Sequence, residues 1–141
     1  MISKKLKFEI VNYLENIIEN KFNFFSKKTI GIYIRSFHIV LPYNFIILFL
    51  FGSKKLNIFI LFFLFTALAF FYIFQGCLLT ILEKKLCGDE YTFIDPFIEF
   101  HNLELNNKNR YEISLYVAIL YVLLMIFIFL LRFYIYPMFI K

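Results

Sequence analysis

Charge is missing from three long stretches of this chain. Ser36 to Ser53 covers 18 residues without Lys, Arg, Asp or Glu, Leu56 to Leu82 covers 27, and Ile113 to Leu131 covers 19. A helix that crosses the roughly 30 Å hydrocarbon core of a bilayer needs roughly 20 apolar residues. The first stretch reaches that length if its helix begins a few residues earlier. The three absences therefore predict three membrane spans, and no separate soluble domain fits between them.

Cysteine is also scarce. The two residues present, Cys77 and Cys87, are too few for a disulfide framework or a cysteine-based metal site, and we expect two free thiols. The chain has no nucleophile elbow, P-loop, HExxH, CxxC or TVGYG-like filter. It also has no Arg-rich run or nucleic-acid recognition motif. We therefore predict no catalytic residues, no cofactor, no metal and no nucleic-acid partner.

What the chain does contain is apolar. It is 62% hydrophobic with a mean hydropathy of +0.76, and 22 of its residues are Phe. A soluble domain holds about 45–50% apolar residues. We predict an all-α integral membrane protein with a three-helix bundle in the lipid bilayer. The expected spans are 30–52, 56–83 and 112–136 within a membrane domain 30–137, with a polar segment at 84–111.

Two further helices are expected outside the spans. Residues 1–29 form an amphipathic segment in which apolar residues recur at three- and four-residue steps. It is predicted to lie in the membrane interface, with packing on the protein's own cytosolic surface as the alternative. Asp95 and Pro96 predict the start of a short interfacial helix, with the Asp95 carboxylate as its cap.

Orientation follows from the count of Lys and Arg. The side that holds the N-terminal region and the 84–111 segment carries 11 of the 15 basic residues when Arg35 is included. The positive-inside tendency therefore predicts a cytosolic N-terminus. All ten acidic residues lie on the same side, so net charge alone favours the reverse.

Polar side chains at membrane depth are costly and are often functional. If the first two spans form a continuous helical hairpin, we expect Arg35 at the same membrane depth as Tyr72 and within reach of Gln75. His38 is expected at the same depth as Ala69. A histidine in this position is typical of a hydrogen bond between helices, and a proton relay is the alternative. The predicted intramembrane polar cluster consists of Arg35, His38, Gln75, Cys77, Thr80 and Glu83.

Small residues on the second and third spans predict close helix packing. They recur at helical spacing along one stripe, which is expected either to pack within the bundle or between copies, or to line a substrate path. The predicted seam consists of Thr66, Ala69, Gly76, Ser114 and Ala118.

Residues 74–86 (FQGCLLTILEKKL), followed by 91–97 (YTFIDPF), carry a resemblance. They are similar to a family of small, uncharacterised multi-pass membrane proteins of large nucleocytoplasmic DNA viruses. Members similarly pair a histidine on the first span with a polar-Gly-Cys-x-x-Thr-x-x-Glu motif on the second, although Gln75 stands where asparagine is more usual. The resemblance covers about residues 35–121 and implies a virion membrane, or a host membrane recruited for assembly. The matching positions are His38, Gln75, Cys77, Thr80 and Glu83.

Three functions remain open from sequence. The leading hypothesis is a non-enzymatic protein with a structural or membrane-organising role, which the resemblance implies to be viral. Its expected partner is a second copy, another membrane protein or a capsid protein. The first alternative is a small oligomeric ion or proton channel lined by His38, Gln75 and Thr80. The second is an intramembrane enzyme that uses Cys77 or Glu83, for which no paired group is evident in the sequence.

Overall fold

The chain is helical through most of the residues that the computed structural model describes, which are 4–136. The helices in chain order are α1 (Lys4–Lys21), α2 (Lys27–Phe51), α3 (Lys54–Ile73), α4 (Leu78–Cys87), α5 (Asp95–Phe100) and α6 (Asn107–Leu130), and the chain continues from α6 as a π-helix over Leu131–Ile135. The predicted all-α class is confirmed.

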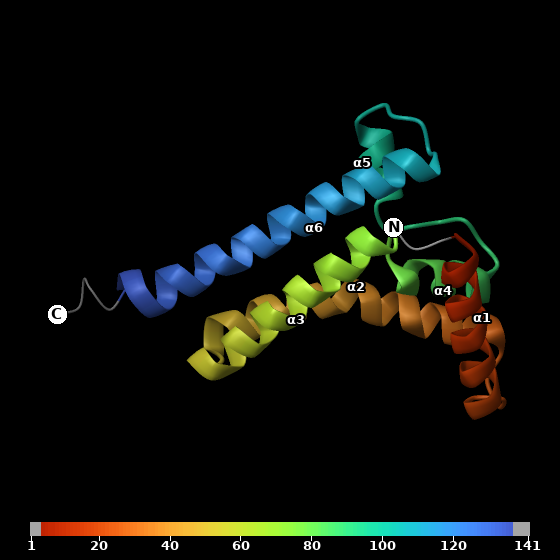
Figure 1. The fold of residues 1–141 in the computed structure, drawn as a ribbon, viewed down its shortest axis with the longest axis horizontal. Coiled ribbons are helices and arrows are strands. Elements are labelled where there is room, and N and C mark those ends of the chain that lie inside the picture. The colour runs from red at the N-terminus through yellow and green to blue at the C-terminus, as the bar shows by residue number, and fades with distance from the viewer. Residues whose placement is uncertain (1–3, 137–141) are drawn as a thin grey trace.

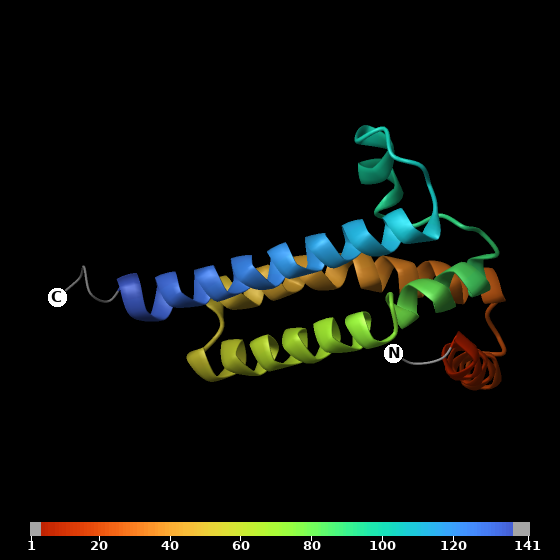
Figure 2. The same cartoon turned by 45° about the horizontal axis from the view of Figure 1, so that its top comes forward.

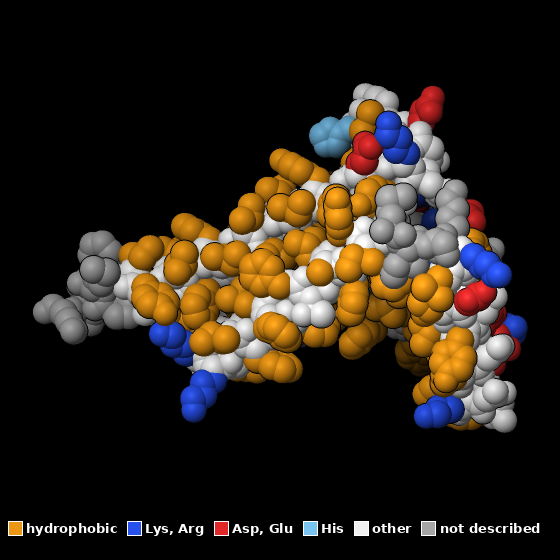
Figure 3. Space-filling model, in the orientation of Figure 1, with side chains coloured by type: hydrophobic (Ala, Val, Ile, Leu, Met, Phe, Trp, Pro, Cys, Tyr) orange, Lys and Arg blue, Asp and Glu red, His pale blue; other side chains and the backbone are white. Residues whose placement is uncertain are grey.

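The three long helices form the elongated part of the molecule, and α1, α4 and α5 gather at one end of it (Figures 1 and 2). Lys27–Phe51, Lys54–Ile73 and Asn107–Ile135 are long and apolar enough to cross a membrane. Hydrophobic side chains cover this elongated part, whereas charged ones gather toward its ends (Figure 3). Phe59 is 67% exposed and Phe62 is 71% exposed. Such an exterior has the composition of a lipid-facing surface.

The long helices pack on one another through large side chains. α3 contributes Ile60 and Leu64, and α6 contributes Val122, Met125 and Phe129, with Phe49 of α2 fully buried between them. The Tyr121 hydroxyl also donates a hydrogen bond to the Pro42 carbonyl at 2.7 Å, which ties α6 to α2.

The predicted small-residue seam does not form this contact. Ala69 is exposed, and the Thr66 hydroxyl donates to the Phe62 carbonyl of its own helix at 2.9 Å. Gly76 lies beyond the end of α3, while Ser114 and Ala118 are half-buried on α6. The prediction of a seam within the chain is therefore wrong for α3, because Ile60 and Leu64 face α6 instead. A seam between copies stays a prediction.

A tight turn joins α2 to α3. Ser53 caps α3 by accepting a hydrogen bond from the Leu56 N–H at 3.3 Å. A Cβ at Gly52 would lie 2.3 Å from the Leu48 carbonyl oxygen, so only glycine fits. Beside the turn, the fully buried Asn57 donates to the Phe49 carbonyl at 3.0 Å, and this carbonyl also accepts from Arg132 at 2.6 Å. These bonds connect the turn with the end of α6.

The continuous helix predicted over 56–83 is wrong. α3 ends at Ile73 and α4 begins at Leu78, and the backbone between them takes positive φ at Gln75 (51°) and Gly76 (132°). A φ of 132° favours glycine and cannot continue a right-handed helix. The break separates the apolar α3 from α4, whose second half carries Glu83, Lys84 and Lys85.

Other boundaries shift by a few residues because polar side chains cap the helices. α2 begins at Lys27 rather than residue 30, since the Ser26 hydroxyl accepts from the Thr29 N–H at 3.2 Å. α6 begins at Asn107 rather than residue 112, since the Asn106 side chain accepts from the Asn109 N–H at 2.8 Å. The predicted end of the membrane domain at residue 137 lies outside the described residues.

α1 packs against α4. Val11 is fully buried with Leu82 and Leu86 of α4 and Ile30 of α2. Glu15 forms an ion pair with Lys85 of α4. This contact matches the alternative made from sequence, which was packing on the protein itself. Phe8 and Tyr13 on α1 remain 61% and 67% exposed. Contact between lipid and the face of α1 that carries these two residues stays a prediction.

α5 is held to the first turn of α6. The predicted helix at Asp95 is present, but the Asp95 carboxylate does not cap it. The carboxylate instead accepts hydrogen bonds from the N–H and the hydroxyl of Thr92. It also accepts two from the Arg110 guanidinium, from Nε at 2.8 Å and from Nη2 at 2.9 Å. Burial raises the pKa of this carboxyl, but the bonds from Arg110 and Thr92 outweigh it and hold the pKa below its ordinary value.

Candidate active site

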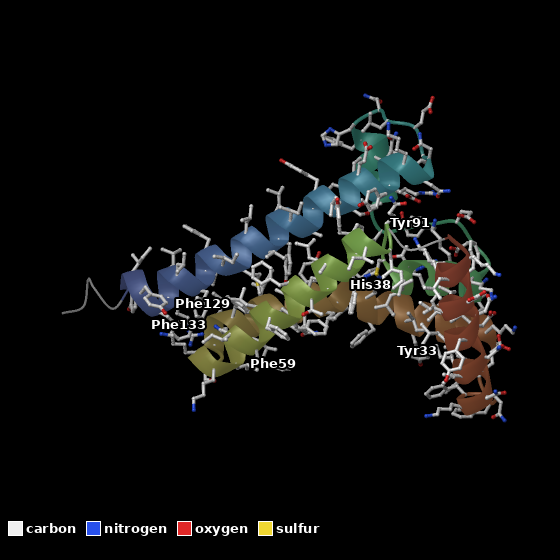
Figure 4. All side chains as sticks on the ribbon, viewed as in Figure 1. Tyr33, His38, Phe59, Tyr91, Phe129 and Phe133 are labelled. Atoms are coloured by element: carbon white, nitrogen blue, oxygen red, sulfur yellow. The ribbon has the colours of Figure 1, made fainter. Side chains whose placement is uncertain are left out.

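Four of the six polar residues predicted to cluster meet where α4 packs on the N-terminal half of α2. Arg35 and His38 come from α2, Cys77 precedes α4, and Glu83 lies within α4. Figure 4 labels His38 in this region and Tyr91 near it. The helices approach closely here, since a Cβ at Gly31 would lie 2.7 Å from the Cys87 sulfur.

The break after α3 places Cys77 at the start of α4. Cys77 is the N-cap residue, with an extended backbone (φ −77°, ψ 124°). The preceding Gln75 holds a left-handed conformation that costs of order 1–3 kcal/mol in a non-glycine residue. The Lys7 ammonium of α1 satisfies the carbonyls left open by the break, donating to Phe74 at 2.8 Å and to Gln75 at 3.2 Å.

His38 lies between a thiol and a carboxylate. Its Nε2 is 3.5 Å from the Cys77 sulfur, and its Nδ1 is 3.4 Å from Oε2 of Glu83. Glu83 is 1% exposed, so its carboxylate is shielded from water. A thiol, an imidazole and a carboxylate in this order are the nucleophile, base and orienting group of covalent catalysis. Both separations are long for hydrogen bonds, as is common for such groups without substrate.

The same three residues are not arranged as a metal site. Cys77 and Glu83 contact different nitrogens of the imidazole ring, so their donor atoms do not converge on one point. Within residues 4–136, no three His, Cys, Asp or Glu side chains are grouped to hold a metal ion. The geometry is that of a proton relay through the ring.

Arg35 neutralises the acidic side of this site. Its guanidinium donates to both oxygens of Asp89, at 2.6 and 3.1 Å, and its Nε lies 4.0 Å from Oε1 of Glu83. The hydrogen bond from Arg35 holds the pKa of Asp89 below its ordinary value. The break after α3 lets α4 lie beside α2, so that Arg35 and His38 both contact Glu83 of α4.

The loop after α4 covers the site. Gly88 ends α4 with φ 71°, and the chain then returns so that Arg35 lies over the Tyr91 ring, 5.6 Å from its centroid. Phe93 contacts the His38 ring edge-on, with centroids 5.9 Å apart. These aromatic contacts limit water around the imidazole. Asp89, Tyr91 and Phe93 were missed from sequence.

Cys77 is reachable through an open cavity of about 1050 Å³. Its walls come from α1, the 74–77 break, α4, the loop after α4 and the start of α6. Cys77, Gln75 and Thr80 line the cavity, whereas His38 and Glu83 are not among the described lining residues. The thiol therefore faces the cavity with its base and carboxylate behind it.

The thiol is activated by its surroundings. Burial by itself raises the pKa of Cys77, but the hydrogen bond with His38, the charge of the imidazole and the backbone N–H groups of Thr80 and Leu79 bring it below the ordinary value. Cys87 provides a contrast, because burial raises its pKa. Both cysteines are free and half-buried, as predicted for the thiols.

Comparison with protein-family models, with curated proteins and with solved structures finds no match to this chain. The resemblance to membrane proteins of large DNA viruses therefore stays a prediction. The site has to be interpreted from its own geometry.

Proposed function

We propose that the three apolar helices cross a bilayer and that Cys77 is a nucleophile for acyl transfer at the membrane surface, with His38 as its base and Glu83 orienting the imidazole. The observation that carries this proposal is the position of His38, whose two ring nitrogens face the Cys77 sulfur and the Glu83 carboxylate. The opening of the thiol into a cavity supports it.

The chemistry follows from these positions. The Cys77 sulfur attacks an acyl carbonyl while its proton passes to Nε2 of His38. The bond from the carbonyl carbon to the leaving group breaks, the leaving group takes the proton from His38, and a thioester on Cys77 remains. Water or a hydroxyl acceptor then attacks the carbonyl carbon of the thioester and gives its proton to His38. The bond from that carbon to the Cys77 sulfur breaks, the acid or ester is released, and the proton returns from His38 to the Cys77 thiolate. Glu83 stabilises the imidazolium that forms in each half-reaction.

A labelling experiment tests the proposal. The protein in detergent micelles is treated with iodoacetamide at pH 7, and alkylation of each cysteine is followed by peptide mass spectrometry. A lowered thiol pKa raises the thiolate fraction, so we expect Cys77 to react faster than Cys87. His38→Gln should slow the alkylation of Cys77 and leave that of Cys87 unchanged.

Cys87 is a matched control because it is also half-buried and lies at the same contact between α2 and α4. If His38→Gln only loosens this contact, both cysteines will react faster together. That result, or equal rates for the two cysteines in the unaltered protein, would refute a nucleophilic Cys77.

A second candidate is the structural or membrane-organising role expected from sequence. Its support is the contact of the buried Glu83 with Arg35 and His38, since these pairs also fasten α4 to α2. A second copy or a capsid protein is the partner that this role would need. The channel hypothesis has less support, because Gln75 and Thr80 line the cavity and His38 does not.

The location is proposed from the basic residues and the resemblance. With a cytosolic N-terminus, α1, α4 and the cavity lie on the cytosolic side of a virion membrane or of a host membrane. Protease treatment of sealed vesicles tests the orientation, since a tag before α1 should be removed from the cytosolic side and a tag after residue 141 should be protected. Protection of the first tag would reverse the orientation.

A further inference from the structure

The cavity in front of Cys77 has an apolar side next to the long helices. Phe71 at the end of α3 stacks on Tyr111 at the start of α6, with centroids 5.6 Å apart and rings 7° from parallel. Phe74 and Phe93 also line the cavity. The aromatic side of the cavity therefore adjoins the surface that a bilayer would cover, at the level where the apolar helices end.

Basic residues also line the cavity. Among the described residues, five Lys and Arg side chains and two acidic ones, Asp89 and Glu90, line it. Glu90 is shared by Lys84 at 3.2 Å and Arg110 at 4.0 Å. Three of the lining cations pair with carboxylates that do not line the cavity, namely Glu15, Asp95 and Glu112.

Lys7 is the basic residue best placed to bind an anion. Among residues 4–136, the other four lining cations each lie within 4.0 Å of a carboxylate, and Lys7 does not. Its hydrogen bonds go to two backbone carbonyls, which carry no full negative charge. Its Nζ lies 3.6 Å from the position of a Cβ on Gly76, the residue before Cys77.

We propose that the acyl donor is a long-chain acyl group on a phosphate-bearing carrier, with the chain on the aromatic side of the cavity and the phosphate at Lys7. This inference depends on the proposed function, because it names the substrate class of the same thiol. A glycerophospholipid and a long-chain acyl-coenzyme A share this chemistry. In both, a carbonyl joins an apolar chain to a carrier with phosphate, and attack by Cys77 gives the same acyl thioester and releases the carrier as an alcohol or a thiol.

The test detects this thioester directly. The protein is reconstituted into vesicles of ether-linked phosphatidylcholine, which has no ester to donate. One arm contains dioleoyl phosphatidylglycerol in addition, and the other receives oleoyl-coenzyme A. Hydroxylamine-sensitive oleoylation of the Cys77 peptide in either arm, measured by mass spectrometry, is the expected result, and the arm in which it occurs identifies the carrier.

Variants of α1 then test the role of Lys7. A lost charged hydrogen bond lowers binding by about tenfold or more, so Lys7→Gln should lower the acylation rate at least tenfold relative to the iodoacetamide rate of the same variant. Lys7→Arg should restore most of the rate, because it keeps the charge. Lys5→Gln is the matched control on the same helix, since Lys5 does not line the cavity.

The failures of the two proposals are distinguishable. Fast alkylation of Cys77 without oleoylation from either donor would overturn the substrate class and leave the nucleophile in place. Oleoylation that is equal in Lys7→Gln and Lys5→Gln would overturn the role of Lys7. Slow alkylation of Cys77 would overturn the proposed function itself.

Discussion

Removing the buried carboxylate of Glu83 should destabilise the protein far more than removing the exposed one of Asp89. Both acids lie beside Arg35, but Glu83 is 1% exposed and the Asp89 side chain is 44% exposed. Glu83 also holds Nδ1 of His38 at 3.4 Å. Charges about 4 Å apart attract by about 4 kcal/mol at an effective dielectric constant of 20, and desolvation offsets part of this.

We expect Glu83→Ala to cost about 3 kcal/mol or more, because it removes the carboxylate from Nδ1 of His38 and opens a void between α2 and α4. Glu83→Gln should cost less, since an amide of the same size can still bond to the imidazole. Asp89→Asn should cost below about 1 kcal/mol, the value of a solvent-screened ion pair.

The assay is unfolding by sodium dodecyl sulfate in mixed micelles, followed by circular dichroism. Asp89→Asn is the control, because it removes the same charge from the same arginine on the exposed side. An equal loss of stability in Asp89→Asn and Glu83→Ala would refute the argument that burial makes Glu83 important.

Three other predictions concern the helical end of the molecule. The pKa of Asp95 is lower in the folded protein than in the unfolded one, so its ionised carboxylate stabilises the fold above the unfolded pKa near 4. This stabilisation is lost as the pH falls through the folded pKa. The free energy of unfolding should therefore decrease less on acidification in Asp95→Asn than in the unaltered protein. Gly31→Ala should cost about 1–3 kcal/mol in the micelle assay, since its Cβ would lie 2.9 Å from the backbone nitrogen of Cys87, and no loss would show that α2 and α4 are further apart. Leu82→Ala should cost about 2–5 kcal/mol and release α1 to limited proteolysis, and unchanged protection of α1 would show that it is held elsewhere.

The sequence contained most of the outline of the fold. Three charge-free stretches correspond to the three long helices, and Asp95-Pro96 begins the short α5. These features depend on local composition and on side chains close in the chain. For the same reason the starts of α2 and α6 were misplaced only by a few residues, where Ser26 and Asn106 act as caps.

The break between α3 and α4 was not predictable from local pattern. Residues 56–82 contain no charged side chain, and one glycine in such a stretch is compatible with a continuous helix. The conformation of Gln75 and Gly76 is supported by Lys7, about 68 positions earlier in the chain. A contact of this range leaves no periodic signal in the sequence.

In the polar cluster, too, the residues could be identified from the sequence but their long-range contacts could not. Arg35, His38, Cys77 and Glu83 were identified as polar groups that required an explanation, but their pairing was drawn on a straight hairpin. In the structure the break shifts α4 along α2, so that Glu83 lies near Arg35 and His38. The relay could therefore not be recognised until the backbone was known.

The position of Cys77 separates the two candidate functions. A structural lock between α2 and α4 needs only Glu83 with Arg35 and His38, and it gives no reason for a thiol at the other ring nitrogen. It also gives no reason for a left-handed Gln75 before that thiol, or for a cavity that reaches it. Cys77→Ser keeps the shape of the side chain and removes the thiolate. If the lock were the whole function, this substitution would leave both stability and biological activity unchanged. Loss of activity with unchanged stability is what a nucleophile requires.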